Sequence, residues 1–338
     1  MKKEDISEIK VLLSTPKKIV IIPHRNPDGD AIGSTLGLMH YLKQYNHEVT
    51  VVAPNDYPHF LKWVPGESTI VKFDTQNKIS EELINNANII FTLDFNALHR
   101  TGDDMGHFLE SNNTLKIMID HHQAPDNYAK YMYSDVNMSS TCEMVYNFIE
   151  LLGDANKITS EIATCIYVGI MTDTGSFKYS STTSKTHHII AELINLGADN
   201  SKIHDLIYDN YSEKRTKLLG YCLNDKLQIF PELNSAIISL TEEELKKFNF
   251  KKGDTEGVVN YALAIKGIIF AVFIAEKEGV VKLSLRSKGD FKVNEIAKKY
   301  FSGGGHMNAS GGISDLSVNK SIEKVISIFK ENKINLTK

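Results

Sequence analysis

The sequence is poor in cysteine, with only Cys142, Cys165 and Cys222 among its 338 residues. These cysteines are far apart and odd in number, so they form neither a disulfide framework nor a cysteine-type zinc site. Such sparse cysteine is typical of proteins in a reducing compartment. The sequence therefore predicts a cytoplasmic protein.

Long hydrophobic runs are also missing. The longest clean apolar stretch is IIFAVFIA, residues 268–275, whereas a helix that crosses a bilayer needs about 20 apolar residues. The first ten residues, MKKEDISEIK, are charged and contain no apolar segment of the kind found in secretion signals. We therefore expect neither a membrane partner nor secretion.

An excess of positive charge is absent as well. The chain has 38 Lys and Arg against 42 Asp and Glu, a net charge of −4. Proteins that coat long nucleic acids are usually basic, so any nucleic-acid substrate is expected to be short and held in a local site. Arginine, the residue best suited to bidentate phosphate contacts, occurs only as Arg25, Arg100, Arg215 and Arg286.

The first part of the chain has the pattern of an α/β domain. Short apolar runs typical of buried strands alternate with segments of helical spacing, which predicts a parallel sheet flanked by helices. The strands are expected at residues 18–24, 47–54, 88–94 and 115–122, and the helices at residues 31–45, 79–87, 140–153 and 160–175.

The pattern changes after about Leu196. Residues 196–218 are polar and helical and are interpreted as a linker between domains 1–195 and 219–338. Strands are expected at residues 235–241, 267–277 and 280–287, with a hairpin turn at KEGV and a last helix at 320–331. The second domain is therefore predicted to be a smaller α+β domain.

Histidines and aspartates follow the apolar strands of the first domain. In an open α/β sheet, ligands bind outside the carboxyl ends of the strands, so these groups are expected at one edge of the sheet. They are His24, Asp28 and Asp30 after the first strand, Asp94 after the third, Asp120, His121 and His122 after the fourth, and Asp173 after a helical run.

This set of side chains suits two divalent metal ions. Carboxylates can bridge cations about 3.5–4 Å apart, an arrangement that serves phosphoryl transfer. A mixture of imidazole and carboxylate ligands with carboxylates in the majority favours Mn²⁺. The six candidate ligands are His24, Asp28, Asp30, Asp94, His121 and Asp173.

These motifs resemble a known family. HRNPDGDAIGS, LDFNALHRTG, IDHH, GIMTDTGSF and GGGHMNASGG occur in the order found in the DHH phosphoesterase superfamily. The resemblance is closest to its nanoRNase / pAp phosphatase (NrnA-type) branch, which has a DHH-associated C-terminal domain, and it covers nearly the whole chain. It implies a site in the cleft between the two domains and a homodimer.

The resemblance also implies a role for each metal-site residue. His24 and Asp28 would hold one metal ion, Asp30 and His121 the other, and Asp94 and Asp173 would bridge them. The nucleophile would be a water molecule between the two ions.

Three further residues would act beside the metal ions. Asp120 would hydrogen-bond a histidine and fix its tautomer, a role that supports ligand geometry in many metal sites. His122 would serve as a general acid or contact the phosphate. Arg100 would contact the scissile phosphate.

Substrate binding would fall mainly to the second domain. Arg286 would hold a terminal phosphate, and the GGGH segment would let backbone N–H groups approach a phosphate closely, since glycine has no Cβ. Ser34, near the start of the first helix, is a further candidate for phosphate contact, although helix capping would also explain it. The substrate-binding candidates are Arg286, Gly303, Gly304, Gly305, His306 and Ser34.

The implied activity is hydrolysis of short oligoribonucleotides to 5′-mononucleotides and of pAp to AMP and phosphate. Cleavage of cyclic-di-AMP or pApA is the main alternative, because the motifs of the two groups overlap. A manganese pyrophosphatase would carry a basic signature in the second domain where this chain has GGGH. A RecJ-type exonuclease would be much longer, and a scaffold without catalysis would have lost a ligand or His122.

Overall fold

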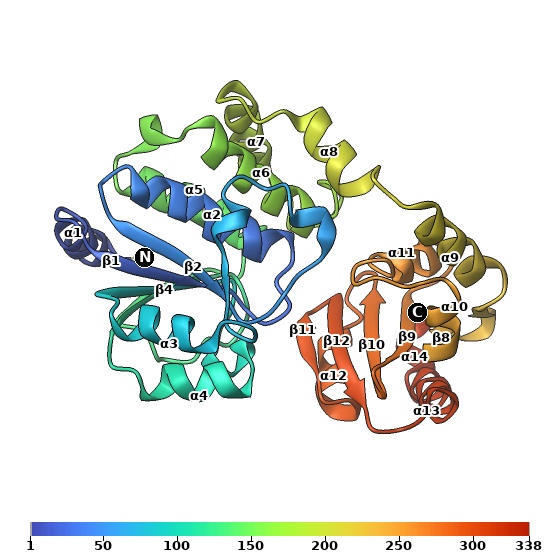
Figure 1. The fold of residues 1–338 in the computed structure, drawn as a ribbon. Coiled ribbons are helices and arrows are strands. Elements are labelled where there is room, and N and C mark those ends of the chain that lie inside the picture. The colour runs from blue at the N-terminus through green and yellow to red at the C-terminus, as the bar shows by residue number, and fades with distance from the viewer. Residues whose placement is uncertain (1, 338) are drawn as a thin grey trace. The chain divides into compact units, whose positions relative to one another are not determined.

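The computed structural model describes residues 2–337 (Figure 1). The chain divides into two compact units, and the boundary lies between Asn210 and Tyr211. Residues 196–218, interpreted above as a linker, contain helix α8 (Asn200–Tyr208), which is part of the first unit, and the start of α9 (Glu213–Asn224), which is part of the second.

The first unit is built on a parallel sheet. Among the described residues this sheet has six strands, ordered β3-β2-β1-β4-β5-β6, and every neighbouring pair is parallel. The predicted architecture is therefore confirmed, although two short strands, β3 and β6, were not expected. The strands are β1 (Lys18–Ile22), β2 (Glu48–Ala53), β3 (Val71–Lys72), β4 (Ile89–Leu93), β5 (Leu115–Asp120) and β6 (Tyr131–Ser134).

Helices cover both faces of this sheet. The alternation of side chains along β1 places Ile19 and Ile21 in one core with α1, α2, α5 and α6, and Val20 and Ile22 in another with α3 and α4. The helices are α1 (Lys3–Leu12), α2 (Gly29–Lys43), α3 (Asn77–Asn85), α4 (Asp103–Ser111), α5 (Thr141–Leu151), α6 (Ser160–Asp173) and α7 (Ser184–Asn195), with 3-10 turns at His59–Leu61, Glu67–Thr69, Leu98–Thr101 and Ala155–Lys157.

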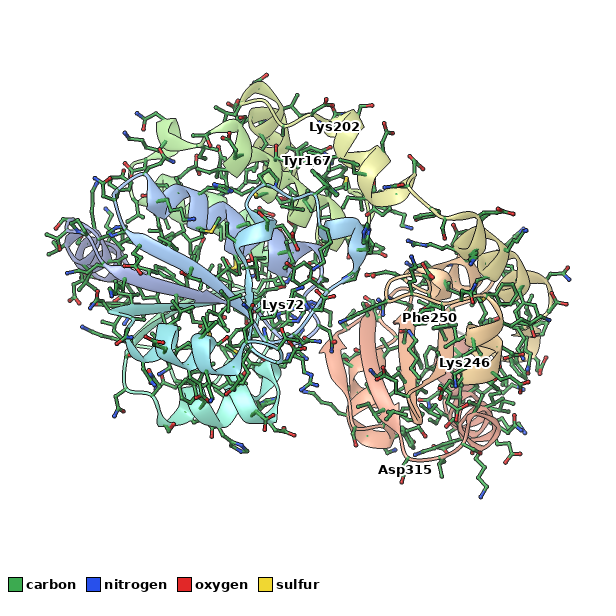
Figure 2. The ribbon with its side chains drawn as sticks, in the orientation of Figure 1. Lys72, Tyr167, Lys202, Lys246, Phe250 and Asp315 are labelled. Atoms are coloured by element: carbon green, nitrogen blue, oxygen red, sulfur yellow. The ribbon has the colours of Figure 1, made fainter. Side chains whose placement is uncertain are left out.

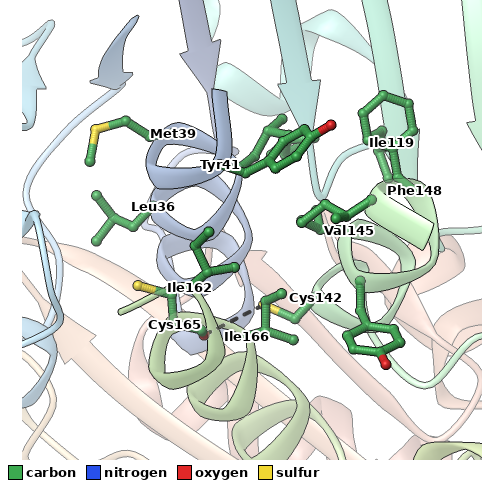
Figure 3. Close-up of a cluster of buried hydrophobic side chains, with 14 of the residues drawn as sticks. Leu36, Met39, Tyr41, Ile119, Cys142, Val145, Phe148, Ile162, Cys165 and Ile166 are labelled. Atoms are coloured by element: carbon green, nitrogen blue, oxygen red, sulfur yellow. Dashed lines mark hydrogen bonds between the residues drawn. The ribbon is translucent and has the colours of Figure 1, made fainter. Parts of the chain in front are cut away.

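Helices α2 and α6 cross at very short range. A Cβ at Gly33 would lie 2.4 Å from the Cys165 carbonyl oxygen, and a Cβ at Gly169 would lie 2.1 Å from Cys142 Sγ. Figure 3 shows the apolar side chains of α2, α5 and α6 that fill the surrounding core. At Gly33 the backbone of α2 lies directly against that of α6, and at Gly169 the Cys142 side chain of α5 fits against α6, so the three helices pack closely.

The second unit contains a mixed sheet, ordered β11-β12-β10-β9-β8-β7 in the described residues. Strands β8 and β9 pair in parallel and the other neighbours are antiparallel. This confirms the predicted α+β character. The strands are β7 (Leu227–Phe230), β8 (Ser235–Leu240), β9 (Phe270–Lys277), β10 (Val280–Ser287), β11 (Gly304–His306) and β12 (Ala309–Ser314).

Both faces of this mixed sheet are covered by helices. One core joins the sheet to α12 and α13, and the other joins it to α9, α10 and α11. The tight turn between β9 and β10 has positive φ at Glu278 and Gly279, as the predicted KEGV hairpin requires. The helices are α10 (Glu242–Lys247), α11 (Val258–Ala264), α12 (Val293–Tyr300), α13 (Val318–Glu331) and α14 (Lys333–Leu336), with a 3-10 turn at Pro231–Leu233.

The outward faces of the helices carry polar side chains. Lys202 on α8 and Lys246 on α10 are exposed, and Figure 2 shows both at the surface of their helices. Across residues 2–337, none of the helices has the length and apolar character needed to cross a membrane.

Candidate metal centre

The candidate site lies where β1, β4 and β5 end. These strands are neighbours in the sheet, so the residues that follow them converge at one edge. Three groups of potential ligands form there, His24 with Asp28 and Asp94, Asp30 with Asp94 and His121, and Asp94 with Asp120 and His122. Within each group the ligand atoms lie within 4.8 Å of one another, and Asp94 is common to all three.

Asp94 lies between two histidines. Its Oδ2 is 3.5 Å from His24 Nε2, and its Oδ1 is 3.6 Å from His121 Nε2. The Thr141 hydroxyl donates a hydrogen bond of 2.9 Å to Oδ1. The backbone of Asp94 is left-handed, with φ of 66°, so the chain turns sharply at the end of β4 and directs the carboxylate between the two imidazoles.

Each of these histidines is oriented by a backbone carbonyl. His24 Nδ1 lies 2.8 Å from the Arg25 carbonyl oxygen, and His121 Nδ1 lies 3.2 Å from that of Met138. A carbonyl oxygen accepts a proton, so Nδ1 is the protonated nitrogen and the Nε2 lone pair points toward the carboxylates. This is the tautomer that a metal ligand requires.

Two helix N-termini hold the aspartates of the first motif. Asp28 is the N-cap of α2, and its Oδ1 accepts hydrogen bonds of 3.1 Å from the backbone N–H groups of Asp30 and Ala31. Asp30 is buried and receives the N–H groups of Thr141 and Cys142 at the start of α5, at 2.6 and 2.8 Å. The partial positive charge of that helix end favours the carboxylate there.

Asp173 completes the set of predicted metal ligands. It is the last residue of α6, and its Oδ2 lies 3.5 Å from His121 Nε2. Asp30 Oδ2 is 3.9 Å from the same nitrogen. The structure thus places all six predicted ligands around one small volume.

The site concentrates negative charge in a buried place. Burial raises the pKa of Asp30, and burial together with the charges of Asp30 and Asp28 raises the pKa of Asp94 well above its ordinary value. Burial lowers the pKa of His24, whereas the pKa of His121 is raised because Asp173 and Asp30 outweigh its burial. Carboxylates crowded in this way are stabilised by cations, and oxygen with imidazole nitrogen is a donor set that fits divalent metal ions.

Asp120 and His122 form a pair beside the ligands. His122 Nδ1 donates to Asp120 Oδ1 over 2.7 Å, which leaves His122 Nε2 directed away from Asp120. Asp120 is fully buried, and its Oδ2 has no hydrogen-bond partner among the described residues. The carboxylate therefore orients His122 and stays apart from solvent.

Arg100 lies in the 3-10 turn after β4. Burial lowers the pKa of His24, and the positive charge of Arg100 acts in the same direction. The Arg100 Nε atom is buried and has no acceptor in the part of the chain that the structure describes. Its backbone carbonyl accepts the Arg25 N–H at 2.8 Å, which ties this turn to the His24 loop.

Ser34 lies inside α2 and not at the surface of the site. It is fully buried, and its hydroxyl donates to the Ala31 carbonyl at 3.3 Å. The structure gives this side chain a role within the helix, because a hydroxyl in this position faces the helix backbone and the core.

The remaining candidates belong to the second unit. Arg286 on β10 and His306 on β11 are half-buried. A Cβ at Gly303 would lie 2.1 Å from the Gly311 carbonyl oxygen, and one at Gly305 would lie 2.7 Å from that of Ala309. These two glycines therefore let β11 lie close to β12, which gives the glycine run a structural reason.

The residues that support the candidate ligands carry no motif that marks them for this role in the sequence. Met138, Thr141 and Cys142 bind His121, Asp94 and Asp30 through hydrogen bonds. A local signal existed, since Ser140 followed by Glu143 is the S-x-x-E pattern of a helix start. That pattern predicts the start of α5 but not its place beside the metal site.

Comparison with known proteins shows which family this chain resembles. The model of the DHH family, N-terminal domain, matches residues 18–170, and that of the DHHA1 domain matches residues 234–332. The bifunctional oligoribonuclease and PAP phosphatase NrnA of Thermus thermophilus is 30% identical over 323 residues, which are 95% of this chain and 92% of the relative.

Two further similarities are informative. The crystal structure of an exopolyphosphatase-related protein from Bacteroides fragilis has a TM-score of 0.95 and 41% identity, covering 100% of this chain and 98% of that one. The cyclic-di-AMP phosphodiesterase GdpP of Bacillus subtilis is 25% identical over 330 residues, 94% of this chain but 48% of the relative. The similarity to GdpP is thus weaker and covers about half of that protein.

Proposed function

This chain belongs to the DHH family, in its NrnA-type branch, and on that premise we propose that it is a dimetal phosphoesterase. Its substrates are short oligoribonucleotides, cleaved to 5′-mononucleotides, and pAp, cleaved to AMP and phosphate. The observation that carries the proposal is the position of Asp94, whose two carboxylate oxygens face the Nε2 atoms of His24 and His121.

The residues fit two divalent cations, and Mn²⁺ suits the mixed donor set. His24 and Asp28 would hold one ion and Asp30 and His121 the other, with Asp94 and Asp173 shared between them. When bound, the two ions supply Lewis-acid chemistry, which activates water and neutralises charge on the phosphate.

His122 is proposed to act on the scissile phosphate. Its Nδ1 proton is held by Asp120, so in the imidazolium form the Nε2–H would donate its proton to the phosphate or to the leaving 3′ oxygen and leave the neutral imidazole. Asp120 keeps the imidazole in that orientation. The orphaned Nε of Arg100 would donate to a phosphate oxygen near His24.

The second unit is proposed to bind the other phosphate of the substrate. Arg286 would pair with a terminal phosphate, and His306 with the backbone N–H groups of Gly303–Gly305 would contact the sugar-phosphate chain. Oligoribonucleotides and pAp then require one chemistry, since both carry a phosphate on a 3′ oxygen and a second phosphate at the 5′ end. The cytoplasmic location and the homodimer stay predictions.

A comparative hydrolysis assay tests the substrate assignment. The purified chain with Mn²⁺ is offered pApA, pAp, cyclic-di-AMP, pyrophosphate and short-chain polyphosphate at equal concentration. We expect AMP to be released from both pApA and pAp, with little hydrolysis of the other three. Removal of the metal with EDTA should abolish both activities, and Mn²⁺ should restore them.

Other outcomes would redirect the assignment. Preferred cleavage of cyclic-di-AMP would move the protein to second-messenger turnover and leave the metal site intact. Preferred cleavage of polyphosphate would match the name of the Bacteroides fragilis protein. Hydrolysis that survives EDTA and is insensitive to added Mn²⁺ would contradict the dimetal mechanism itself.

A further inference from the structure

Glu143 is a buried carboxylate that lies beside the metal centre without belonging to it. It occupies the third position of α5 and is 2% exposed. Its Oε2 accepts hydrogen bonds from the backbone N–H and the hydroxyl of Ser139 and from the Thr186 hydroxyl. A carboxylate is costly to bury, so this one must be satisfied by such donors.

On one side Glu143 clamps the segment that precedes α5. In that segment the Met138 carbonyl accepts the Nδ1 proton of His121, and the Thr141 hydroxyl donates to Asp94. Ser139 lies between these two residues, and both of its donors are bound by Glu143. A shift of Ser139 would therefore move the partners of two proposed metal ligands.

On the other side Glu143 binds the start of α7. Thr186, which is fully buried, donates to Glu143 over 3.1 Å and also forms a capping box with Thr183. The residues between α6 and α7 follow directly on Asp173, another proposed ligand. Glu143 thus joins two segments. One contains Met138, the hydrogen-bond partner of His121, and the other begins after Asp173 and leads to Thr186.

Helix capping alone does not account for this arrangement. In a standard capping box the side chain at the third position bonds the backbone N–H of the N-cap residue. Here the N-cap is Ser140, yet Glu143 binds Ser139, one residue earlier, and a hydroxyl from another helix. The hydrogen bonds of Glu143 therefore join the segment before α5 to α7, which a helix cap would not do.

We propose that Glu143 is a positioning residue, which sets the affinity of the site for divalent cations by holding the Met138–Thr141 segment against α7. It acts through hydrogen bonds and not as a ligand. The inference rests on the proposed metal site. Loss of partners that orient metal ligands lowers metal affinity by about 10–100-fold in other proteins, and a change of that size is expected here.

Titration calorimetry of the full chain with Mn²⁺ alone tests this role. Glu143→Ala should weaken Mn²⁺ binding by about 10–100-fold. Glu143→Gln keeps an oxygen acceptor for Ser139 and should stay within a few-fold of wild type. Thr186→Val removes one donor at nearly constant shape and should weaken Mn²⁺ binding in the same direction by a smaller factor.

A matched control separates positioning from stability. Asp199 is the N-cap of α8 and accepts the Lys202 N–H, so Asp199→Ala removes a helix cap away from Glu143. This variant should unfold at a lower temperature and bind Mn²⁺ as tightly as wild type.

The outcomes distinguish the two proposals. Wild-type affinity in folded Glu143→Ala or in Thr186→Val would overturn the positioning role, as would Glu143→Gln binding as weakly as Glu143→Ala, which would assign the effect to charge. If Glu143→Ala does not fold, the Gln and Thr186→Val proteins decide. A wild-type chain that binds no Mn²⁺ would instead overturn the proposed metal site.

Discussion

At the scale of single residues, Asp94 has the most demanding position in the site. Its backbone has the left-handed conformation, and its carboxylate is almost fully buried and faces the imidazoles of His24 and His121. Without a cation its charge is unfavourable there, as the raised pKa of its carboxyl shows. A carboxylate held there is expected to lower the stability of the metal-free chain, and in the proposed site the bound cations would offset this cost.

Asp94→Asn should therefore have opposite effects on stability and activity. Asparagine accepts the same backbone and shape but carries no charge, so the metal-free variant should unfold at the same or a higher temperature than the metal-free wild type. Hydrolysis of pApA should fall by more than about 100-fold, beyond the usual effect of a residue that only supports a ligand.

Thermal unfolding in EDTA and in Mn²⁺, together with the pApA assay, measures both effects. Asp74→Asn is the matched control, because Asp74 is exposed and follows the short strand β3. A metal-free Asp94→Asn protein clearly less stable than wild type would show that this carboxylate stabilises the fold without a cation.

At the scale of elements, the N-termini of helices make hydrogen bonds that hold several of the important side chains in place. Asp28 caps α2, the start of α5 holds Asp30, and in the second unit Thr241 and Glu244 form a capping box at α10. Glu244 also accepts hydrogen bonds from Tyr221 and Lys226, at 2.6 and 2.8 Å. A short helix such as α10 depends on contacts of this kind.

The α10 contacts predict a pH-dependent stability. Partial burial opposes ionisation of Glu244, but hydrogen bonds from Lys226, Tyr221 and the Thr241 N–H prevail and lower its pKa to about 2. The pKa is lower in the folded than in the unfolded chain, so the stabilisation is complete above about pH 4.5 and is lost as the pH falls toward 2.

Glu244→Gln should accordingly lower the free energy of unfolding by about 1 kcal/mol at pH 7, since the carboxylate is partly exposed to solvent. The difference from wild type should shrink as the pH falls from 4.5 to 2. Urea unfolding in EDTA, followed by circular dichroism, measures it. The exposed Glu243→Gln is the control, and a difference independent of pH would refute the role of the charge.

At the scale of the whole molecule, the chain has separate cores for its two units. The first unit buries apolar clusters on both faces of the parallel sheet, and the second does so around the mixed sheet. All six proposed metal ligands lie between residues 24 and 173, within the first unit. Ligand binding stabilises the folded part that holds the site.

Calorimetry of the full chain should therefore resolve two unfolding transitions. Mn²⁺ at about 100 times its dissociation constant should stabilise one of them by about 2.7 kcal/mol and leave the other unchanged. The Glu244→Gln variant should shift the transition that Mn²⁺ leaves unchanged. Because Glu244 lies in the second unit, this shift would assign that transition to the second unit. A single transition that moves as a whole with Mn²⁺ would show that the units unfold together.

The sequence by itself determined the class of the fold and the set of ligand types. Strand and helix periodicity is local, and a parallel sheet brings the ends of its strands to one edge, so His24, Asp94 and His121 could be expected near one another. The KEGV turn was equally predictable, because its geometry depends on two adjacent residues.

Tertiary structure alone decided which groups each side chain meets. The family resemblance predicted that Asp120 would hydrogen-bond a histidine, but only the structure shows that this histidine is His122. The contacts of Glu143 and the parallel pairing of β8 with β9 join segments distant in the chain. Such contacts depend on how whole elements pack, and local patterns of residues do not encode them.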